Sequence, residues 1–325
     1  MTSPSAGVVA VVGEALVDFV QPGPEPLFEA FVGGSPANVA VGLARLGVPA
    51  RLAARIGADP LGRRIRRHLD ANGVDLSYAV AAKEHSSLAI VAIGDDGAAD
   101  YDFRVEGTAD WQWRDGELSK ALGTPVVAVH SGSLALTMAP GADVVLAALA
   151  TARAQATISY DPNCRPLLMG PRDELLARVE RVLAVADVVK ASADDLAWLV
   201  PSASPEEVAQ DWLARGPAVV AITLGPAGVV AAAREAGVLR RPSLAVPVAD
   251  TVGAGDSFTS AFLAGLRAHG LVGAERRDDL RRVDARTLGE LLEQAVLASA
   301  FTCTRHGPEP PTAAELKAFL TPVPE

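Results

Sequence analysis

Short apolar and β-branched runs alternate with helical patterns along most of the chain. Strands are predicted at 8–12, 50–54, 125–129, 157–160, 187–190 and 218–223, and helices at 36–46, 61–71, 141–155, 173–184, 193–199 and 206–215. The predicted strands are apolar on both sides, which is typical of parallel strands that helices cover on both faces. The sequence therefore predicts an α/β fold with three layers, α/β/α, and a mostly parallel central sheet.

One region interrupts this alternation. Residues 76–108 contain two strand-like segments, Ser87–Ile93 and Asp100–Arg104, joined by Gly94-Asp95-Asp96-Gly97. An Asp-Gly pair between such segments predicts a β-hairpin. The hairpin would be either a lid that closes over a site or a structural edge. Because open sheet edges invite partners, we expect a homodimer formed through this lid.

Composition and charge exclude several function classes. The chain has 325 residues, half of them hydrophobic, and a formal net charge of −10. It lacks the basic face of a general nucleic-acid binder and the run of about 18 apolar residues that spans a membrane. The segment Met1-Thr2-Ser3-Pro4-Ser5 does not resemble a signal peptide. We therefore expect a cytoplasmic protein without nucleic-acid or membrane partners.

The strongest chemical signal is the segment 250–260, which reads Asp-Thr-Val-Gly-Ala-Gly-Asp-Ser-Phe-Thr-Ser and runs into an apolar helical pattern. Its glycines allow a tight turn. The free N–H groups and the dipole of the following helix form an anion site at Gly253, Ala254 and Gly255. A carboxylate beside a phosphate cradle favours phosphoryl transfer to a hydroxyl, with Asp256 as the base. The alternative is that Asp256 is an ordinary helix N-cap.

Polar residues also follow other predicted strands, where ligands of open α/β sheets bind. Asp18 and Asn38 can hydrogen-bond to polyol hydroxyls. Arg165 and Lys190 can neutralise phosphate charge. The turn Thr223-Leu224-Gly225-Pro226-Ala227-Gly228 would let a nucleotide phosphate approach the backbone. The P-loop, dinucleotide-binding and protein-kinase motifs are absent from the sequence, which excludes or disfavours those classes.

Two segments resemble the signatures of the ribokinase-like (PfkB) carbohydrate kinases. Gly33-Gly34-Ser35-Pro36-Ala37-Asn38-Val39-Ala40, followed by Leu43, Leu46 and Gly47, resembles the first signature, and Asp250-Thr251-Val252-Gly253-Ala254-Gly255-Asp256-Ser257-Phe258 resembles the second. The motifs between them occur in the family's order, so the resemblance covers nearly the whole chain. It implies one ribokinase-like kinase domain over 1–325, with a β lid formed by about 15–34 and 76–110.

The resemblance also implies roles for individual residues. Asp256 would be the catalytic base, beside an anion hole formed by Gly253, Ala254 and Gly255. The sugar would be bound by Asp18, Gly34 and Asn38. The ATP site would be lined by Thr223, Gly225 and Gly228, and Asn163 and Arg165 would lie at a strand end near the phosphates.

Magnesium and a monovalent cation are the expected cofactors beside ATP. The family often carries Asn-x-x-Glu where this chain has Ser192-Ala193-Asp194-Asp195. Asp195 can organise Mg²⁺ through water, because Mg²⁺ keeps much of its hydration shell. Ser192 is a shorter ligand, so its contribution to Mg²⁺ or phosphate binding is left open. Asp250 and the backbone of Val252 match a cation loop that many members use for a monovalent ion such as K⁺.

The segments 13–18, 33–38, 101–104 and 107–110 look most like those of bacterial fructokinases. The resemblance thus implies ATP-dependent phosphorylation of a primary hydroxyl of a ketose, D-fructose to fructose 6-phosphate. Arg104 would either reach the substrate or remain a surface charge of the lid. 2-Keto-3-deoxygluconate kinase is the nearest alternative, since an acidic sugar would suit Arg104 and Arg165.

Three further alternatives remain. Ribokinase is one. A nucleoside kinase would need an aromatic wall beside the lid, for which Trp111 and Trp113 are the candidates in the sequence. A sugar-binding regulator on a kinase scaffold, without turnover, is the non-enzyme alternative; the intact Gly-Ala-Gly-Asp run argues against it.

Overall fold

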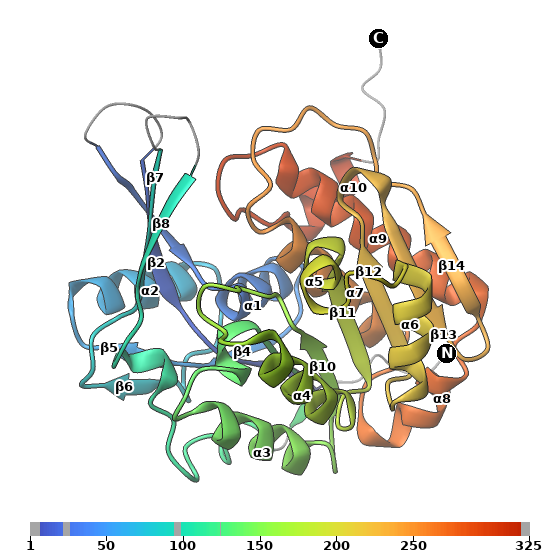
Figure 1. The fold of residues 1–325 in the computed structure, drawn as a ribbon, viewed down its shortest axis with the longest axis horizontal. Helices are drawn as coiled ribbons and strands as arrows, with labels where there is room; N and C mark the ends of the chain where they lie inside the picture. Colours follow the sequence, from blue (N-terminus) through green and yellow to red (C-terminus); the bar gives the residue numbers. More distant parts are fainter. Residues whose placement is uncertain (1–6, 22–26, 94–98, 124, 320–325) are drawn as a thin grey trace.

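The computed structural model describes residues 7–21, 27–93, 99–123 and 125–319. Figure 1 shows a body in which helices cover a central sheet, and a smaller twisted sheet that projects from it. The central sheet has the strand order β14-β13-β12-β11-β10-β9-β1-β4. Its strands are β1 (Val8–Val12), β4 (Ala50–Ala53), β9 (Val126–Gly132), β10 (Thr157–Asp161), β11 (Val188–Ser192), β12 (Val219–Thr223), β13 (Val229–Ala233) and β14 (Gly237–Arg241).

The strands from β4 to β12 are parallel to their neighbours, and β13 and β14 are antiparallel. The parallel part confirms the strands predicted from apolar runs, with ends shifted by a few residues. The antiparallel pair was not predicted. Its β13 segment, Val-Val-Ala-Ala-Ala, is rich in alanine and so gives a weak strand signal.

Helices cover both faces of this sheet, which confirms the three-layer α/β/α architecture. They are α1 (Ser35–Arg45), α2 (Pro60–Ala71), α3 (Ala142–Ala152), α4 (Arg172–Leu183), α5 (Ala193–Leu199), α6 (Pro205–Ala214), α7 (Ala254–Ala268), α8 (Arg277–Arg281), α9 (Ala285–Cys303) and α10 (Ala313–Phe319). Alternate strand residues point to opposite faces. Val9 and Val11 of β1 accordingly pack in a core with α1, α7 and α9, whereas Ala10 and Val12 pack in a second core with α3, α4 and α6.

The projecting sheet has the order β3-β2-β7-β8 and lies in the segments expected to form the lid. Its strands are β2 (Leu16–Val20), β3 (Glu29–Gly33), β7 (Leu88–Ile93) and β8 (Ala99–Arg104). β7 and β8 pair antiparallel, as the hairpin signal predicts; the predicted turn at 94–97 lies outside the described residues. A short pair, β5 (Arg55–Gly57) and β6 (Val80–Ala82), lies beside α2.

In the described part of the chain, no helix combines the length and the apolar character that crossing a bilayer requires.

Candidate active site

A cleft of about 1460 Å³ lies between the projecting sheet, α1, the start of α7 and the carboxyl ends of β11 and β12. A single small-molecule site usually has a volume of about 300–1,000 Å³, so this cleft has room for two substrates side by side. The predicted site residues that line it are Asp18, Gly34, Asn38, Arg165, Lys190, Ser192, Asp195, Thr223, Gly225, Gly228, Asp250, Val252, Gly253, Ala254, Gly255 and Asp256.

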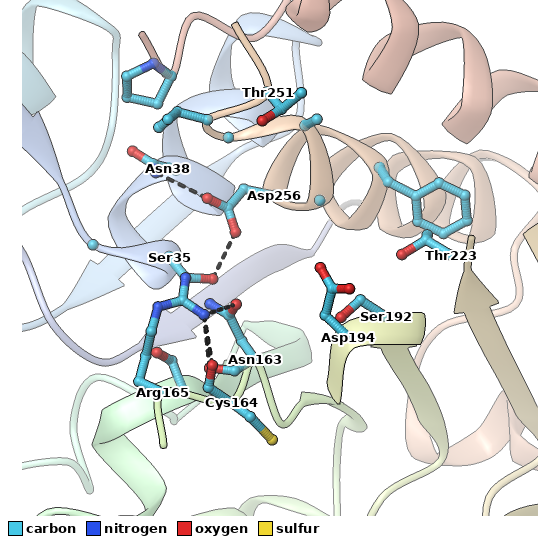
Figure 2. Close-up of a pocket in the computed structure, with 18 of the residues that line it drawn as sticks. Ser35, Asn38, Asn163, Cys164, Arg165, Ser192, Asp194, Thr223, Thr251 and Asp256 are labelled. Carbon is cyan, nitrogen blue, oxygen red and sulfur yellow. Dashed lines mark hydrogen bonds between the residues drawn. The ribbon is translucent and has the colours of Figure 1, made fainter. Parts of the chain in front are cut away.

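Asp256 lies in the first turn of α7, and its carboxylate bridges to α1 (Figure 2). Ser35 Oγ donates to Asp256 Oδ1 at 2.6 Å, and Asn38 Nδ2 donates to Oδ2 at 2.9 Å. The N-cap of α7 is Gly253, so Asp256 is not the N-cap that the alternative interpretation expected. Two helix N-termini thus meet at one carboxylate, which the helix dipoles favour.

The turn before α7 requires glycine. Gly253 has a φ of +77°, and a Cβ there would lie 2.8 Å from Pro308 Cα. A Cβ on Gly255 would lie 2.9 Å from Lys190 Nζ. The Ala254 N–H donates to the Thr251 carbonyl at 3.2 Å. Among the described residues, the N–H groups of Gly253 and Gly255 have no such partner, so these two are the free donors of the expected anion hole.

Lys190 brings a positive charge beside this turn. Its Nζ donates to Asp161 Oδ2 at 2.9 Å, and both side chains are buried. Although burial opposes the charged form, Asp161 and Asp195 raise the pKa of Lys190 above its ordinary value. The ammonium therefore stays protonated next to the place where an anion would bind.

Two buried or half-buried acids face the lid side of the cleft. Burial raises the pKa of Asp18 on β2 to about 6, Arg165 acts in the opposite direction, and Asp256 adds to the rise. Burial likewise raises the pKa of Glu14 to about 7. Glu14 Oε2 is buried without a hydrogen-bond partner. The sequence alone gave no role to Glu14. The Gly13-Glu14 pair, which begins the segment 13–18, was the signal that could have indicated one.

The residues expected near magnesium mostly hydrogen-bond to one another. Ser192 Oγ accepts from the Asp195 N–H at 3.1 Å, Asp195 Oδ2 accepts from the Ser192 N–H at 2.7 Å, and Oδ1 accepts from the Cys164 N–H at 2.6 Å. This reciprocal pattern is a capping box at the start of α5. Asp194, which the sequence analysis passed over, is exposed and lines the cleft beside them.

Asp250 is the centre of the loop expected to hold a monovalent cation. Its Oδ1 accepts from the Val252 N–H at 3.0 Å and its Oδ2 from the Gly307 N–H at 2.9 Å. The carboxylate thus joins the segment before α7 to the segment after α9.

The expected nucleotide residues lie between β12 and β13. Thr223 ends β12, where its Oγ1 donates to the Ala191 carbonyl at 3.3 Å. Gly225 begins a short 3₁₀ helix, η3 (Gly225–Ala227), and Gly228 is its C-cap. Gly225 has a φ of +55°, and no atom would meet a Cβ there within 4 Å. The turn is therefore open to the cleft at Gly225, whereas Gly228 packs closely against the Arg241 carbonyl.

The two arginines differ in position. Arg165 lines the cleft, and its Nη1 donates to Asn163 Oδ1 and to the Cys164 carbonyl, each at 2.9 Å. Arg104 on β8 is not among the cleft-lining residues of the described chain; it is exposed and pairs with Asp102 at 2.6 Å. Arg104 thus lies on the surface of the projecting sheet in the described structure. Trp111 and Trp113 are buried in the core and do not form an aromatic wall.

Comparisons with known proteins agree with this geometry. Residues 8–314 match the model of the pfkB family carbohydrate kinases. A fructokinase from Klebsiella pneumoniae is 36% identical over 271 residues, which cover 82% of this chain and 86% of that protein. A fructokinase from Rhizobium leguminosarum bv. trifolii is 33% identical over 301 residues, which cover 92% of this chain and 86% of that protein.

Solved structures agree as well. A fructokinase with bound ATP from Xylella fastidiosa superimposes with a TM-score of 0.88 at 28% identity, covering 96% of this chain and 98% of that one. A fructokinase double mutant from Vibrio cholerae O395, with fructose, ADP and potassium ion bound, gives 0.84 at 29% identity, covering 98% and 100%. This chain therefore belongs to the pfkB family of carbohydrate kinases.

Proposed function

We propose that this enzyme transfers the γ-phosphoryl group of ATP to a primary hydroxyl of D-fructose and yields fructose 6-phosphate. The observation that carries the proposal is the Asp256 carboxylate, which Ser35 and Asn38 hold at the start of α7 inside a cleft large enough for a sugar and a nucleotide. Two fructokinases are 36% and 33% identical to it over the aligned residues. One relative was solved with fructose and ADP bound.

The arrangement supports an in-line transfer. Fructose would lie under the lid, formed by about 15–34 and 76–110, on Asp18, Gly34 and Asn38. Asp256 would accept the hydroxyl proton, a role usually worth about 10²–10⁴-fold in rate. The Gly253 and Gly255 N–H groups and the Lys190 ammonium would stabilise charge on the transferring phosphoryl group. Positioning and electrostatics do most of the work in such transfers.

ATP would bind along the turn from Thr223 through Gly225 to Gly228. In the described residues, no group of three or more His, Cys, Asp or Glu side chains could hold a metal ion. Magnesium would therefore be bound chiefly by phosphates and water. Asp194, which is exposed, and Asp195, which caps α5, are the acids that would lie beside it. When bound, Mg²⁺ would neutralise phosphate charge.

We further propose that the Asp250 loop binds a monovalent cation through the Asp250 carboxylate and the Val252 backbone. The Vibrio cholerae relative was solved with potassium ion bound, which supports a monovalent cation as a ligand of this enzyme. Turnover should then rise when KCl replaces choline chloride at equal ionic strength, and it should not if the loop is only structural.

The alternative substrates have less support. A 2-keto-3-deoxygluconate kinase would use Arg104 and Arg165 on the sugar carboxylate, but Arg104 is exposed and bonded to Asp102. A nucleoside kinase would stack the base on Trp111 or Trp113, which are buried in the core. Fructose, with neutral hydroxyls, matches the Asp18 and Asn38 side chains of the cleft better.

A coupled assay of ADP release with Mg-ATP tests the proposal against fructose, 2-keto-3-deoxygluconate, ribose, tagatose and adenosine, with a no-sugar control for ATP hydrolysis. The highest kcat/KM should be with fructose. Preference for the keto acid would reassign Arg165 to carboxylate binding. Sugar binding without ADP release from any substrate would indicate the regulator instead.

The lid also carries an apolar surface. Leu27 and Phe28, directly before β3, are 63% and 45% exposed. We propose that two lids pair in a homodimer, because pairing would remove this apolar surface from water and cover the open sheet edge. Sedimentation should give a dimer for the wild type and a monomer for Leu27→Glu/Phe28→Glu; a monomeric wild type would refute the pairing. A cytoplasmic location stays a prediction from sequence.

A further inference from the structure

A second groove, of about 390 Å³, lies between α2, the edge strand β3 and the segment that follows α9. Its volume is within the range of small-molecule sites, about 300–1,000 Å³. We call this space the α2 groove. It is lined by Phe31 and Val32 of β3, by Arg64, Arg67 and His68 of α2, and by Pro308. The reaction proposed above uses no residue of α2.

The helix that lines this groove concentrates positive charge. Residues 60–69 contain four arginines and a histidine and no acid, in a chain whose formal net charge is −10. Arg64, Arg67 and His68 are separated by three and four positions, so they share one face of α2. This basic face is the one that lines the groove.

The charge of the groove is not neutralised by the protein itself. Arg67 has no hydrogen bond or ion pair with another described residue. Arg64 donates to the Ala30 carbonyl, which is a neutral acceptor. Glu309 also lines the groove, but its carboxylate lies 3.8 Å from Arg305 Nη1 and so already has a cationic partner. The groove therefore presents two guanidinium groups without a dedicated counter-ion.

His68 is affected by the same charges. Burial lowers its pKa below the ordinary value, and Arg45 and Arg64 lower it further, while Glu309 acts in the opposite direction. Arg45, in the last turn of α1, thus adds to the positive potential around the groove.

We propose that the α2 groove binds a small phosphate-bearing anion. The planar guanidinium groups of arginine match phosphate oxygens in geometry and form charge-assisted hydrogen bonds with them. Two arginines on one helix face suit a multiply charged phosphate better than a single carboxylate. Phe31, Val32 and Pro308 would pack against any apolar part of the ligand.

An anion at this place would contact both walls of the active-site cleft. Phe31 and Pro308 line the cleft as well as the groove. Pro308 packs on the phosphate turn, since a Cβ on Gly253 would lie 2.8 Å from Pro308 Cα, and a Cβ on Gly307 would lie 3.3 Å from the Phe31 ring. A ligand that holds β3 to this segment would reduce the entropy that sugar binding has to remove. We therefore expect it to tighten fructose binding, an effect that rests on the sugar-kinase function proposed above.

Calorimetric titration with pyrophosphate in the absence of magnesium tests the site without turnover. Arg67→Ala should weaken the groove component of binding about 10-fold or more, as expected for a lost hydrogen bond between charged groups. Arg67→Ala removes no hydrogen bond or ion pair of the described structure, so it should fold as the wild type does. Arg63→Ala is the matched control, because Arg63 is an exposed arginine of the same helix that is not among the described residues lining the groove. Its affinity should stay within about 2-fold of the wild type.

Any pyrophosphate bound in the cleft is common to the three proteins, so the difference between Arg67→Ala and Arg63→Ala reports on the groove alone. Equal affinity of the wild type and Arg67→Ala would overturn the proposal and leave the arginines as an ordinary solvated helix face.

The class of ligand is tested by titrating inorganic phosphate, AMP and succinate in the same way. Phosphate compounds should show the dependence on Arg67, and succinate should not. Tighter Arg67-dependent binding of AMP than of pyrophosphate would identify an organic phosphate as the ligand, and the reverse order would identify an inorganic one. Succinate binding as tight as that of pyrophosphate would refute selection for phosphate.

Steady-state kinetics tests the effect on the sugar. AMP or phosphate at a concentration that fills the groove should lower the fructose KM of the wild type and of Arg63→Ala about 3-fold, and should leave that of Arg67→Ala unchanged, within the usual range of coupling between sites. A KM that responds equally in all three proteins would refute the coupling. If the Arg67-dependent binding is present but no sugar is phosphorylated, the proposed function fails while the anion site is supported.

Discussion

Asp18→Asn should weaken fructose binding and at the same time stabilise the protein. The carboxylate of Asp18 lines the cleft, and its pKa is raised from 3.8 to about 6. A raised pKa means that the folded state disfavours the ionised form. The stability that Asp18 contributes is therefore complete below its unfolded pKa and is lost as the pH rises through about 6. Asparagine does not titrate, so the variant avoids this loss.

The magnitude follows from the shift. About two pKa units correspond to roughly 3 kcal/mol at 1.36 kcal/mol per unit, and water at the mouth of the cleft reduces this to about 1–3 kcal/mol. At about 2.1 cal/mol/K per residue, 325 residues have an unfolding entropy of about 0.7 kcal/mol/K. A gain of about 2 kcal/mol would therefore raise the Tm by about 3 °C.

Thermal unfolding from pH 4 to pH 8 measures this effect, with Asp102→Asn, an exposed acid of the same lid, as the control. The Tm advantage of Asp18→Asn should be near zero at pH 4 and should grow until about pH 7. The fructose KM should rise about 10- to 100-fold, as expected for a lost hydrogen bond to a charged group. A Tm difference that does not change with pH, or a variant that is less stable at pH 8, would refute the reasoning.

Four other variants test other parts of the site. Lys190→Met should lower the free energy of unfolding by about 3–5 kcal/mol, because it leaves Asp161 buried and unpaired, and Lys190→Met/Asp161→Leu should recover most of this loss in the same denaturation assay; equal stability of the two variants would contradict the pairing. Gly255→Ala should reduce kcat about 10- to 100-fold, since its Cβ displaces Lys190 Nζ from beside the phosphate site; unchanged steady-state kinetics would count against the anion hole. Because the pKa of Glu14 is raised to about 7, Glu14→Gln should flatten the pH dependence of the fructose KM near that pH, and superimposable profiles would remove Glu14 from the sugar site.

Local patterns were enough to predict most of the central sheet. The β1 run Val-Val-Ala-Val-Val is apolar on both faces, and the structure buries it between two helical layers. The two glycine-containing segments also identified the turn at Gly253 and the position of Asp256. These features depend on neighbouring residues in the chain, so a single sequence contains them.

Contacts between distant segments were not predictable in the same way. Nothing in the local sequence distinguishes Asp195, which caps α5 and bonds to Cys164, from Asp194, which faces the cleft. The bridge from Asp256 to Ser35 and Asn38 joins residues more than 200 positions apart. The contacts of Asp110 with Ala15 and Ser87 likewise form only when β2 and β7 meet the body. Such contacts depend on how the elements pack.

The measurement that tests the central claim most directly is single-turnover transfer from Mg-ATP to fructose by the wild type and by Asp256→Asn. Asp173→Asn, an exposed acid in the first turn of α4, is the matched control. The account predicts that Asp256→Asn slows the chemical step about 10²–10⁴-fold while fructose still binds, and that the control transfers at the wild-type rate. Near-normal transfer by Asp256→Asn would contradict a base at this position and the mechanism built on it.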